Sequence, residues 1–277
     1  MKKPRRKWPL VFAGVMAIVF VVGFAIALIS SRTLAGTVPG KDPILSLGVT
    51  ENGYLAGTSR GAFVSKDGTT WKRSKEFKRV RTLAASVSGT VFTSSEGVTE
   101  ATNNLEDFAP AVGAVLSSVA ISTDRLGNLY LAGDDHTIAL ATVDRGLQTV
   151  EVPDPPDGPD RIIALAAVPG AKVTLFAGGI STGMWRSTDG GVRWRQILKT
   201  PTRALMVDPK DPRIVYLGTA GGLLISHNRG LRWEFTELRL KVEAISSFGQ
   251  DRFAITEDRL IYRSHDGVTD WRLVSRG

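Results

Sequence analysis

Four basic residues stand at similar places in the chain, each directly before a short run rich in β-formers. Lys241 precedes Val-Glu-Ala-Ile, and three arginines precede comparable runs: Arg81, Arg161 and Arg203. The guanidinium group presents a planar fork of N–H donors that matches a carboxylate or a phosphate. If these side chains converge, they favour an anionic ligand. The alternative is that the four positions are simply solvent-exposed and tolerate a basic residue.

Other charged residues fall in short gaps between apolar runs and differ from gap to gap, as recognition loops do. They are Arg60, Asp134, Asp135, His136, Glu257, Asp258 and Arg259. Positive charge also gathers between Lys72 and Arg79, and negative charge between Asp154 and Asp160. Such polarity suits docking of a partner protein, because complementary charge sets orientation and encounter rate. Solvated loops without a partner are the alternative.

No group of residues predicts a metal or a cofactor. The chain has no cysteine, and its three histidines are scattered. Metal sites need several such ligands at a suitable spacing. The lack of cysteine also excludes disulfides, thiol nucleophiles and a lipidated N-terminal cysteine. We therefore expect no bound metal and no cofactor.

The elements that must position the charged residues follow from an internal repeat. An eight-residue box that starts with Ser and ends with Trp is clear at 187–194, 226–233 and 264–271, and a copy one residue shorter spans 65–71. Weaker copies lie at 101–108 and 142–149. The defining positions are Ser65, Asp67 and Trp71; Asp144 and Gly146; Ser187, Asp189, Gly191 and Trp194; Ser226, Asn228, Gly230 and Trp233; and Ser264, Asp266 and Trp271.

The interval between boxes has a constant interior. Each holds four short β-rich runs separated by Gly, Pro, Asp and Asn, without helical periodicity. In the first interval the runs lie at 45–49, 54–58, 62–65 and near Trp71, and in the last at 244–248, 252–256, 260–264 and near Trp271. A four-stranded unit of about 40 residues, repeated radially, is typical of a β-propeller. We expect an all-β, six-bladed propeller over residues 42–277, with its six units filling 42–274.

This fold gives each group of residues a place. The first strand of a propeller blade is innermost, so the four basic residues would line the mouth of the central channel. The variable gaps between second and third strands would open on the same face. The boxes would form turns on the opposite face, where Ser and Asp bond backbone amides, Gly takes a positive φ and Trp covers the turn. Six similar acidic turns indicate a structural role rather than one active site.

The boxes resemble the Asp-box, or BNR, repeats of sialidases, the sortilin family, certain endoglucanases and the photosystem II stability and assembly factor family. The resemblance covers nearly all of residues 42–274, and the stretch 207–218, continued by the box at 226–233, is most similar to the assembly-factor and sortilin repeats. It implies a propeller that binds proteins, with an arginine-lined surface. Six units are fewer than in those two groups, and the lipidated cysteine of cyanobacterial assembly factors is absent.

Sialidase chemistry is the enzymatic alternative. The Arg-Ile-Pro signature near the first blade is missing, and retaining sialidases also need a Tyr nucleophile paired with a Glu. The tyrosines fall instead within expected strands, Tyr54, Tyr130 and Tyr216 in second strands and Tyr262 in a third. The short loops also leave little scaffold for the two acids of an endoglucanase. We expect no enzyme activity, and a glycan-binding or sialidase-like propeller remains the alternative.

The N-terminus has a different character. A basic flank at 1–9 precedes a run without charge at 10–30, and a linker follows at 31–41. A helix over this run would span about 30 Å, the thickness of a bilayer core. The positive-inside rule puts the flank in the cytoplasm. We expect an uncleaved signal anchor in the cell membrane and an extracytoplasmic propeller, with a cleaved signal peptide as the alternative.

Charge and composition narrow the possible partners. The formal net charge is +8, of which the basic flank supplies five, so only +3 remains for residues 31–277. This excess is too small to predict nucleic-acid binding. Together these features predict a membrane-anchored, non-catalytic module for protein binding or complex assembly, whose partner is a protein or an acidic peptide segment. A purely structural surface module without a ligand is a further alternative.

Overall fold

The structure is a computed structural model. It describes residues 38–42, 44–75, 82–85, 91–95, 98–102, 109–112, 118–123, 129–133, 137–142, 146–151, 161–168 and 171–274. All of them belong to the unit Gly36–Gly277. No helix in these ranges is long and apolar enough to cross a membrane. The anchor expected at 10–30 lies outside the described residues.

The strands of the described residues form six antiparallel sheets of four strands each. Sheet 1 holds β1 (Ile44–Thr50), β2 (Gly53–Thr58), β3 (Gly61–Ser65) and β4 (Lys72–Arg73); sheet 2 holds β5 (Thr82–Ala85), β6 (Val91–Ser95), β7 (Val98–Thr102) and β8 (Ala109–Val112). Sheet 3 holds β9 (Ser118–Thr123), β10 (Leu129–Gly133), β11 (Thr137–Thr142) and β12 (Gly146–Glu151); sheet 4 holds β13 (Ile162–Val168), β14 (Thr174–Gly179), β15 (Gly183–Ser187) and β16 (Arg195–Leu198). Sheet 5 holds β17 (Ala204–Val207), β18 (Val215–Thr219), β19 (Gly222–Ser226) and β20 (Glu234–Phe235); sheet 6 holds β21 (Val242–Phe248), β22 (Asp251–Thr256), β23 (Ile261–Ser264) and β24 (Arg272–Leu273).

The expected strands of the first and last repeats are confirmed to within two residues. The runs expected at 45–49, 54–58 and 62–65 are β1, β2 and β3. The second strands β2, β14, β18 and β22 are largely buried on both faces, and in β18 all five residues are buried. A strand of this kind reads as a short continuous apolar run, which is why the sequence marked it clearly.

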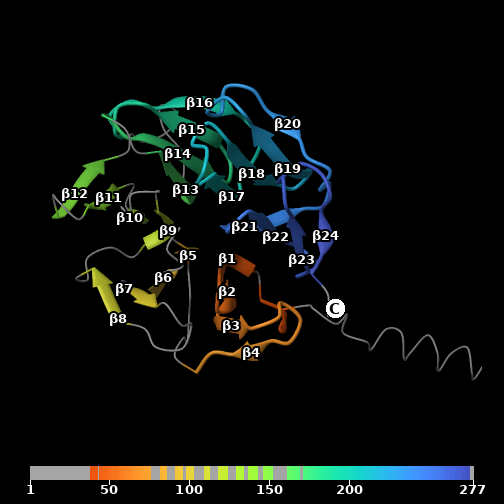
Figure 1. Ribbon diagram of the computed structural model, residues 1–277. Coiled ribbons are helices and arrows are strands. Elements are labelled where there is room, and N and C mark those ends of the chain that lie inside the picture. The colour runs from red at the N-terminus through yellow and green to blue at the C-terminus, as the bar shows by residue number, and fades with distance from the viewer. Residues whose placement is uncertain are drawn as a thin grey trace, which may run out of the picture. The chain divides into compact units, whose positions relative to one another are not determined.

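The six sheets are arranged around a common centre. Each first strand contacts the first strand of the next sheet, through β1, β5, β9, β13, β17 and β21, and β21 contacts β1 again. Figure 1 shows these strands on the inside and the fourth strands, such as β4, β16 and β20, on the outside. Within every sheet the strands follow chain order, so no sheet combines strands from distant parts of the chain.

The apolar core lies between neighbouring sheets, and the box tryptophans take part in it. Trp194 packs on a cluster built from sheets 3 and 4, and Trp233 on one from sheets 4 and 5. Trp271 joins sheets 5 and 6, and Trp71 joins sheets 6 and 1. Each of these tryptophans therefore packs between its own sheet and the preceding one. The sequence predicts that each Trp covers its turn, and the packing against the preceding sheet is an additional contact.

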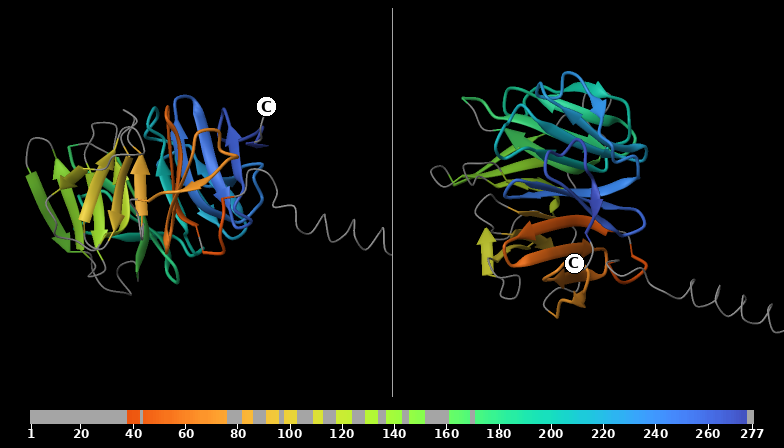
Figure 2. Two further views of the ribbon diagram at one scale, coloured as in Figure 1. Left: turned by 90° about the horizontal axis from the view of Figure 1, so that it is seen from below. Right: turned by 45° about the vertical axis from the view of Figure 1, so that its right-hand side comes forward.

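The turns gather at two ends of this unit. In the left view of Figure 2 the strands run between these ends. The starts of first strands and the turns between second and third strands share one end, which we call the mouth end. The box turns between third and fourth strands lie at the other, the box end, because successive strands of each sheet are antiparallel.

Candidate ligand-binding residues at the mouth end

Three of the four basic residues predicted at strand starts are described, and each directly precedes a first strand. Arg161 precedes β13, Arg203 precedes β17 and Lys241 precedes β21. These strands contact one another in that order. The structure thus brings the three positions to adjacent strand starts at one end. Arg81 lies outside the described residues, although β5 begins at the next position.

An acidic residue, Glu243, lies between two of these basic residues. The Arg203 guanidinium Nη1 donates to Glu243 Oε2 at 3.3 Å, and Lys241 Nζ lies 3.2 Å from Glu243 Oε1. Lys241 Nζ also donates to Glu257 Oε1 at 2.6 Å. The hydrogen bond to Glu257, followed by that to Glu243, raises the pKa of Lys241. A ligand carboxylate at this end must therefore compete with carboxylates of the protein itself.

A β-bulge places Glu243. The pairing of β21 with β22 skips this residue, and the same irregularity occurs at Leu45 in β1 and at Ile163 in β13. A bulge bends the strand and re-aims the extra side chain. Of these three bulges, only that of sheet 6 carries an acid. Glu243 is not among the predicted site residues, although a lone acid near the start of an apolar first strand is a visible signal in the sequence.

The described loop residues that were predicted to contact a ligand already have partners within the protein. Arg60 forms an ion pair with Asp42, with Nε and Oδ1 at 3.1 Å. Asp258 accepts a hydrogen bond from the Thr256 hydroxyl within its own turn. Glu257 is the partner of Lys241 described above. Asp134, Asp135 and His136 lie outside the described residues.

Arg259 has an internal role. Its guanidinium donates to the carbonyl oxygens of Val38, Pro39 and Asp42, and the Val38 N–H donates to the Arg259 carbonyl at 3.1 Å. Arg259 itself has a positive φ of 69°. This contact fastens the chain ahead of sheet 1 to the turn between β22 and β23 of sheet 6. Arg259 is also one of the residues predicted to contact a ligand, and no feature of the repeat indicates its contact with residues 38–42.

The four described box turns share one set of hydrogen bonds. In sheet 4, Ser187 Oγ donates to Asp189 Oδ1 at 2.9 Å and accepts from the Gly191 N–H at 2.8 Å. Trp194 Nε1 donates to the Gly191 carbonyl at 2.8 Å. The boxes of sheets 1, 5 and 6 repeat the Ser contacts. Trp71 and Trp233 repeat the Trp contact, whereas Trp271 Nε1 has no partner among the described residues. Asp144 lies outside them, and Gly146 begins β12.

The box carboxylates are held ionised by their own turns. The Arg193 backbone N–H and side chain, followed by Ser187, lower the pKa of Asp189 from 3.8 to about 2. For Asp266, burial acts to raise the pKa, but hydrogen bonds from Thr269 and Val268 outweigh it and lower the pKa to about 2. Their lone pairs are largely occupied within the turn. This geometry suits a turn-forming role better than catalysis.

Comparison with known proteins identifies the fold and no family. No family model matches the chain, and no curated protein sequence matches it. Among solved structures, YCF48 bound to a D1 peptide is 15% identical over 82% of this chain and 79% of that chain, with a TM-score of 0.54. The WD40 β-propeller domain of Doa1 is 11% identical over 88% and 86% of the two chains, with a TM-score of 0.58. The fold is that of a β-propeller.

At such low identity, the likeness says nothing about what the propeller does. Virginiamycin B lyase from Staphylococcus aureus is 12% identical over 87% of this chain and 86% of that chain, with a TM-score of 0.54. The similar structures thus include an enzyme as well as a protein bound to a peptide. One fold hosts many functions. The site residues of this propeller must carry the functional argument.

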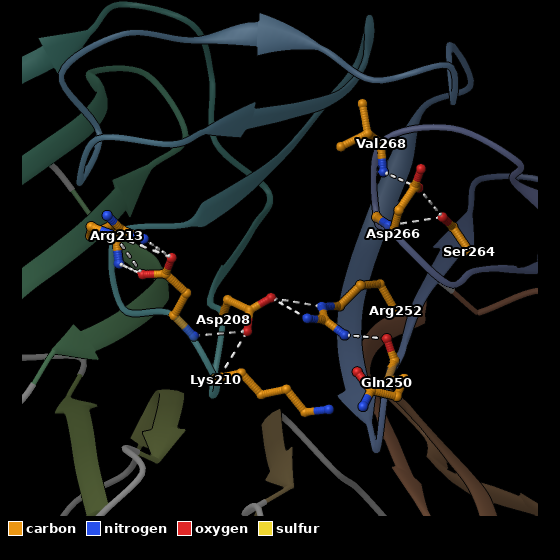
Figure 3. A network of polar contacts seen from close by, with 10 residues as sticks. Asp208, Lys210, Arg213, Gln250, Arg252, Ser264, Asp266 and Val268 are labelled. Carbon is orange, nitrogen blue, oxygen red and sulfur yellow. Dashed lines mark hydrogen bonds and ion pairs between the residues drawn. The ribbon is translucent and has the colours of Figure 1, made fainter.

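At the box end of the propeller, a buried ion pair joins sheets 5 and 6. Asp208 and Arg252 are 2% and 8% exposed. Asp208 Oδ2 accepts from Arg252 Nε at 2.8 Å and also from Nη2, while Oδ1 accepts from the backbone N–H groups of Lys210 and Asp211. Figure 3 shows the pair bridging the two sheets. The Asp208 carboxylate and the Arg252 guanidinium are hydrogen-bonded to each other and to backbone groups. The pair therefore has a structural role.

Proposed function

We propose that this protein is a six-bladed Asp-box β-propeller that acts as a non-catalytic module for protein binding or complex assembly. The observation that carries the proposal is the row of basic residues at the mouth end. Arg161, Arg203 and Lys241 precede three consecutive first strands. The ligand class is an acidic polypeptide segment, because its carboxylates match the donors of arginine and lysine.

The blade number is supported by the sheet arrangement. Among the described residues there are six four-stranded sheets, and their first strands contact one another in a closed cycle. The Asp-box assignment is supported by two contacts that four box turns share: the Ser hydroxyl donates to Asp or Asn and accepts from a Gly N–H. Each sheet is then one blade of the repeat deduced from the sequence.

A protein ligand is supported by the exposure of arginine side chains at the mouth end. Arg161 is exposed there, and the Arg203 side chain is 34% exposed. One similar propeller, YCF48, is bound to a D1 peptide in its solved structure. That likeness is one of fold, so it raises a peptide ligand as a class and does not identify the partner.

The non-catalytic assignment is supported by the tyrosines. A sialidase-like reaction needs an activated Tyr nucleophile, whose pKa must fall. Burial instead raises the pKa of Tyr54 and Tyr262, and raises that of Tyr216 to about 12. Tyr216 and Tyr130 are each 1% exposed. These tyrosines pack in the apolar core between sheets.

We also propose that residues 10–30 form a single membrane span that holds the propeller on the extracytoplasmic side. The support is the uncharged run of residues 10–30 after a basic flank. A membrane anchor suits an assembly module, because it confines the propeller to the surface where membrane complexes form.

The experiment measures binding of an acidic peptide to the full-length protein in detergent micelles. A fluorescein-labelled peptide of alternating Glu and Ser is titrated and followed by anisotropy, beside a peptide with Gln in place of Glu. We expect wild type to prefer the acidic peptide, and Arg161→Gln/Arg203→Gln to bind it about tenfold more weakly, or about 1.4 kcal/mol. Arg232→Gln, an exposed arginine at the box end, is the matched control and keeps wild-type affinity. Equal affinity of the double variant and wild type would move the site away from the mouth end, and no preference for the acidic peptide would reject the ligand class.

A further inference from the structure

Two arginines face each other on the outer strands of sheet 4. Arg186 in β15 and Arg195 in β16 are direct cross-strand partners, so their side chains lie on the same face of the sheet. Arg186 Nη1 donates to the carbonyl oxygen of Arg229, in the box of sheet 5, at 3.0 Å. The pair therefore lies at the box end, where sheet 4 meets sheet 5. Like charges directly opposite each other destabilise a sheet.

No acid among the described residues neutralises this pair. Among the described residues, neither Arg186 nor Arg195 forms an ion pair. The nearest box carboxylate along the chain, Asp189, is bound to Arg193 at 2.9 Å. Burial, and then the charge of Arg195, lowers the pKa of Arg186. Two positive charges are thus held together without an anion.

Sheet 6 provides an internal comparison. Arg263 and Arg272 are also cross-strand partners, and they occupy the same positions relative to the box as Arg186 and Arg195. There each arginine has an acid: Arg263 Nη1 lies 3.9 Å from Asp251 Oδ2, and Arg272 Nε lies 2.6 Å from Asp270 Oδ1. The same arrangement is therefore compensated in sheet 6 and uncompensated in sheet 4.

The turns beside the pair carry apolar side chains. The box turn of sheet 5 packs on sheet 4, since a Cβ at Gly230 would lie 3.0 Å from Phe176 and 3.7 Å from Ile197. That turn carries Leu231, which is 63% exposed, and the box turn of sheet 4 carries Val192, which is 65% exposed. The uncompensated pair is therefore accompanied by two exposed aliphatic side chains, one on each adjoining turn.

We propose that Arg186 and Arg195 form a binding site for a phosphate group at the box end of the propeller. A phosphate monoester carries close to two negative charges at neutral pH and three acceptor oxygens, which match two guanidinium groups better than one carboxylate does. The phosphate is either free or carried on an aliphatic molecule such as a lipid, for which Val192 and Leu231 would supply apolar contacts. The site is distinct from the mouth end and does not depend on the proposed function.

The test is a titration of the full-length protein in detergent micelles with inorganic phosphate, at constant ionic strength against chloride. Ligand binding raises the thermal midpoint. We expect a phosphate-specific rise in wild type that is lost in Arg195→Gln and kept in Arg272→Gln, the equivalent arginine of sheet 6. No phosphate-specific rise in wild type, or an equal rise in all three proteins, would overturn the proposal.

A charge reversal tests the like-charge pair directly. Arg195→Glu places a carboxylate opposite Arg186, so it should raise the midpoint without phosphate and abolish the response to phosphate. A response that persists in Arg195→Glu would also overturn the site.

The source of the phosphate is resolved with a soluble short-chain phosphatidate. Tighter binding of this probe than of inorganic phosphate, with the gain lost in Leu231→Ser, supports a lipid phosphate. Equal binding of the two probes supports free phosphate. Phosphatidate binding that is unaffected by Arg195→Gln would contradict the proposed site.

Discussion

Glu243 limits the binding of an acidic ligand to Arg203 and Lys241 at the mouth end. Its carboxylate contacts both Arg203 and Lys241, so an acidic ligand must displace it. Glu243→Gln keeps the size of the side chain and removes this competing charge. We expect the acidic peptide to bind about fivefold more tightly, equivalent to about 1 kcal/mol for a partly exposed pair. Glu257→Gln is the control and should give a smaller gain, because among the described residues the Glu257 carboxylate pairs with Lys241 alone. Unchanged or weaker binding by Glu243→Gln would mean that the peptide does not meet Arg203 and Lys241.

The box aspartates should give the propeller an acid-dependent stability. The pKa of Asp266 is lowered from 3.8 to about 2, so its contribution is present above about pH 4 and is lost as the pH falls towards 2. Asn228 fills the same position in sheet 5 and accepts from the N–H groups of Leu231 and Arg232. Asp266→Asn should therefore fold, with a smaller loss of stability on acidification. Urea midpoints at neutral pH and near pH 3 measure this, with Asn228→Asp as the reciprocal variant that gains acid sensitivity. An unchanged acid dependence in both variants would refute the assignment.

At the scale of elements, the sequence predicted strands well and contacts between sheets poorly. The strands β1, β2 and β3 were visible because apolar runs and turn residues are local signals. The packing of Trp71 against sheet 6 was not visible, because nothing in a box indicates which neighbour its Trp meets. The contacts of Glu243 and Arg259 could not be predicted from the sequence for a related reason. Their partners come from another blade or from the chain ahead of sheet 1, and a repeat pattern describes only what blades have in common.

Removal of one partner of the ion pair between sheets 5 and 6 should lower the free energy of unfolding strongly. Arg252→Met leaves the Asp208 carboxylate, 2% exposed, with only the N–H groups of Lys210 and Asp211. Loss of one partner of a buried pair costs roughly 3–5 kcal/mol. Asp208→Asn/Arg252→Met removes both charges and keeps an amide oxygen for the turn, so it should recover much of that loss. Urea unfolding of the two variants and wild type measures the difference. A double variant that is no more stable than Arg252→Met would show that the loss comes from packing and not from the buried charge.

At the scale of the whole propeller, closure depends on side-chain contacts. Every described sheet is built from consecutive strands, so in the part of the chain that the structure describes no shared strand joins the first sheet to the last. Sheets 1 and 6 meet through β1 and β21 and through one core cluster that includes Leu47 and Phe253. The contact of Arg259 with residues 38–42 adds the only described hydrogen bonds between the chain ahead of β1 and sheet 6.

Removal of the Arg259 guanidinium should loosen this closure while leaving the blades intact. Arg259→Asn is the suitable change, because Asn tolerates the positive φ of 69° at this position and cannot reach three carbonyl oxygens. We expect a loss of about 2 kcal/mol, as charged donors lose half-buried acceptors, and faster hydrogen exchange at the Val38 amide. Arg229→Asn is the matched control, because Arg229 has a φ of 58° and its side chain forms no hydrogen bond among the described residues. Hydrogen exchange followed by mass spectrometry compares residues 38–50 in the three proteins. Because β1 also packs on β21, exchange should rise across residues 38–50 of Arg259→Asn and stay at the wild-type level in Arg229→Asn. Equal protection in Arg259→Asn and wild type would show that core packing alone closes the propeller.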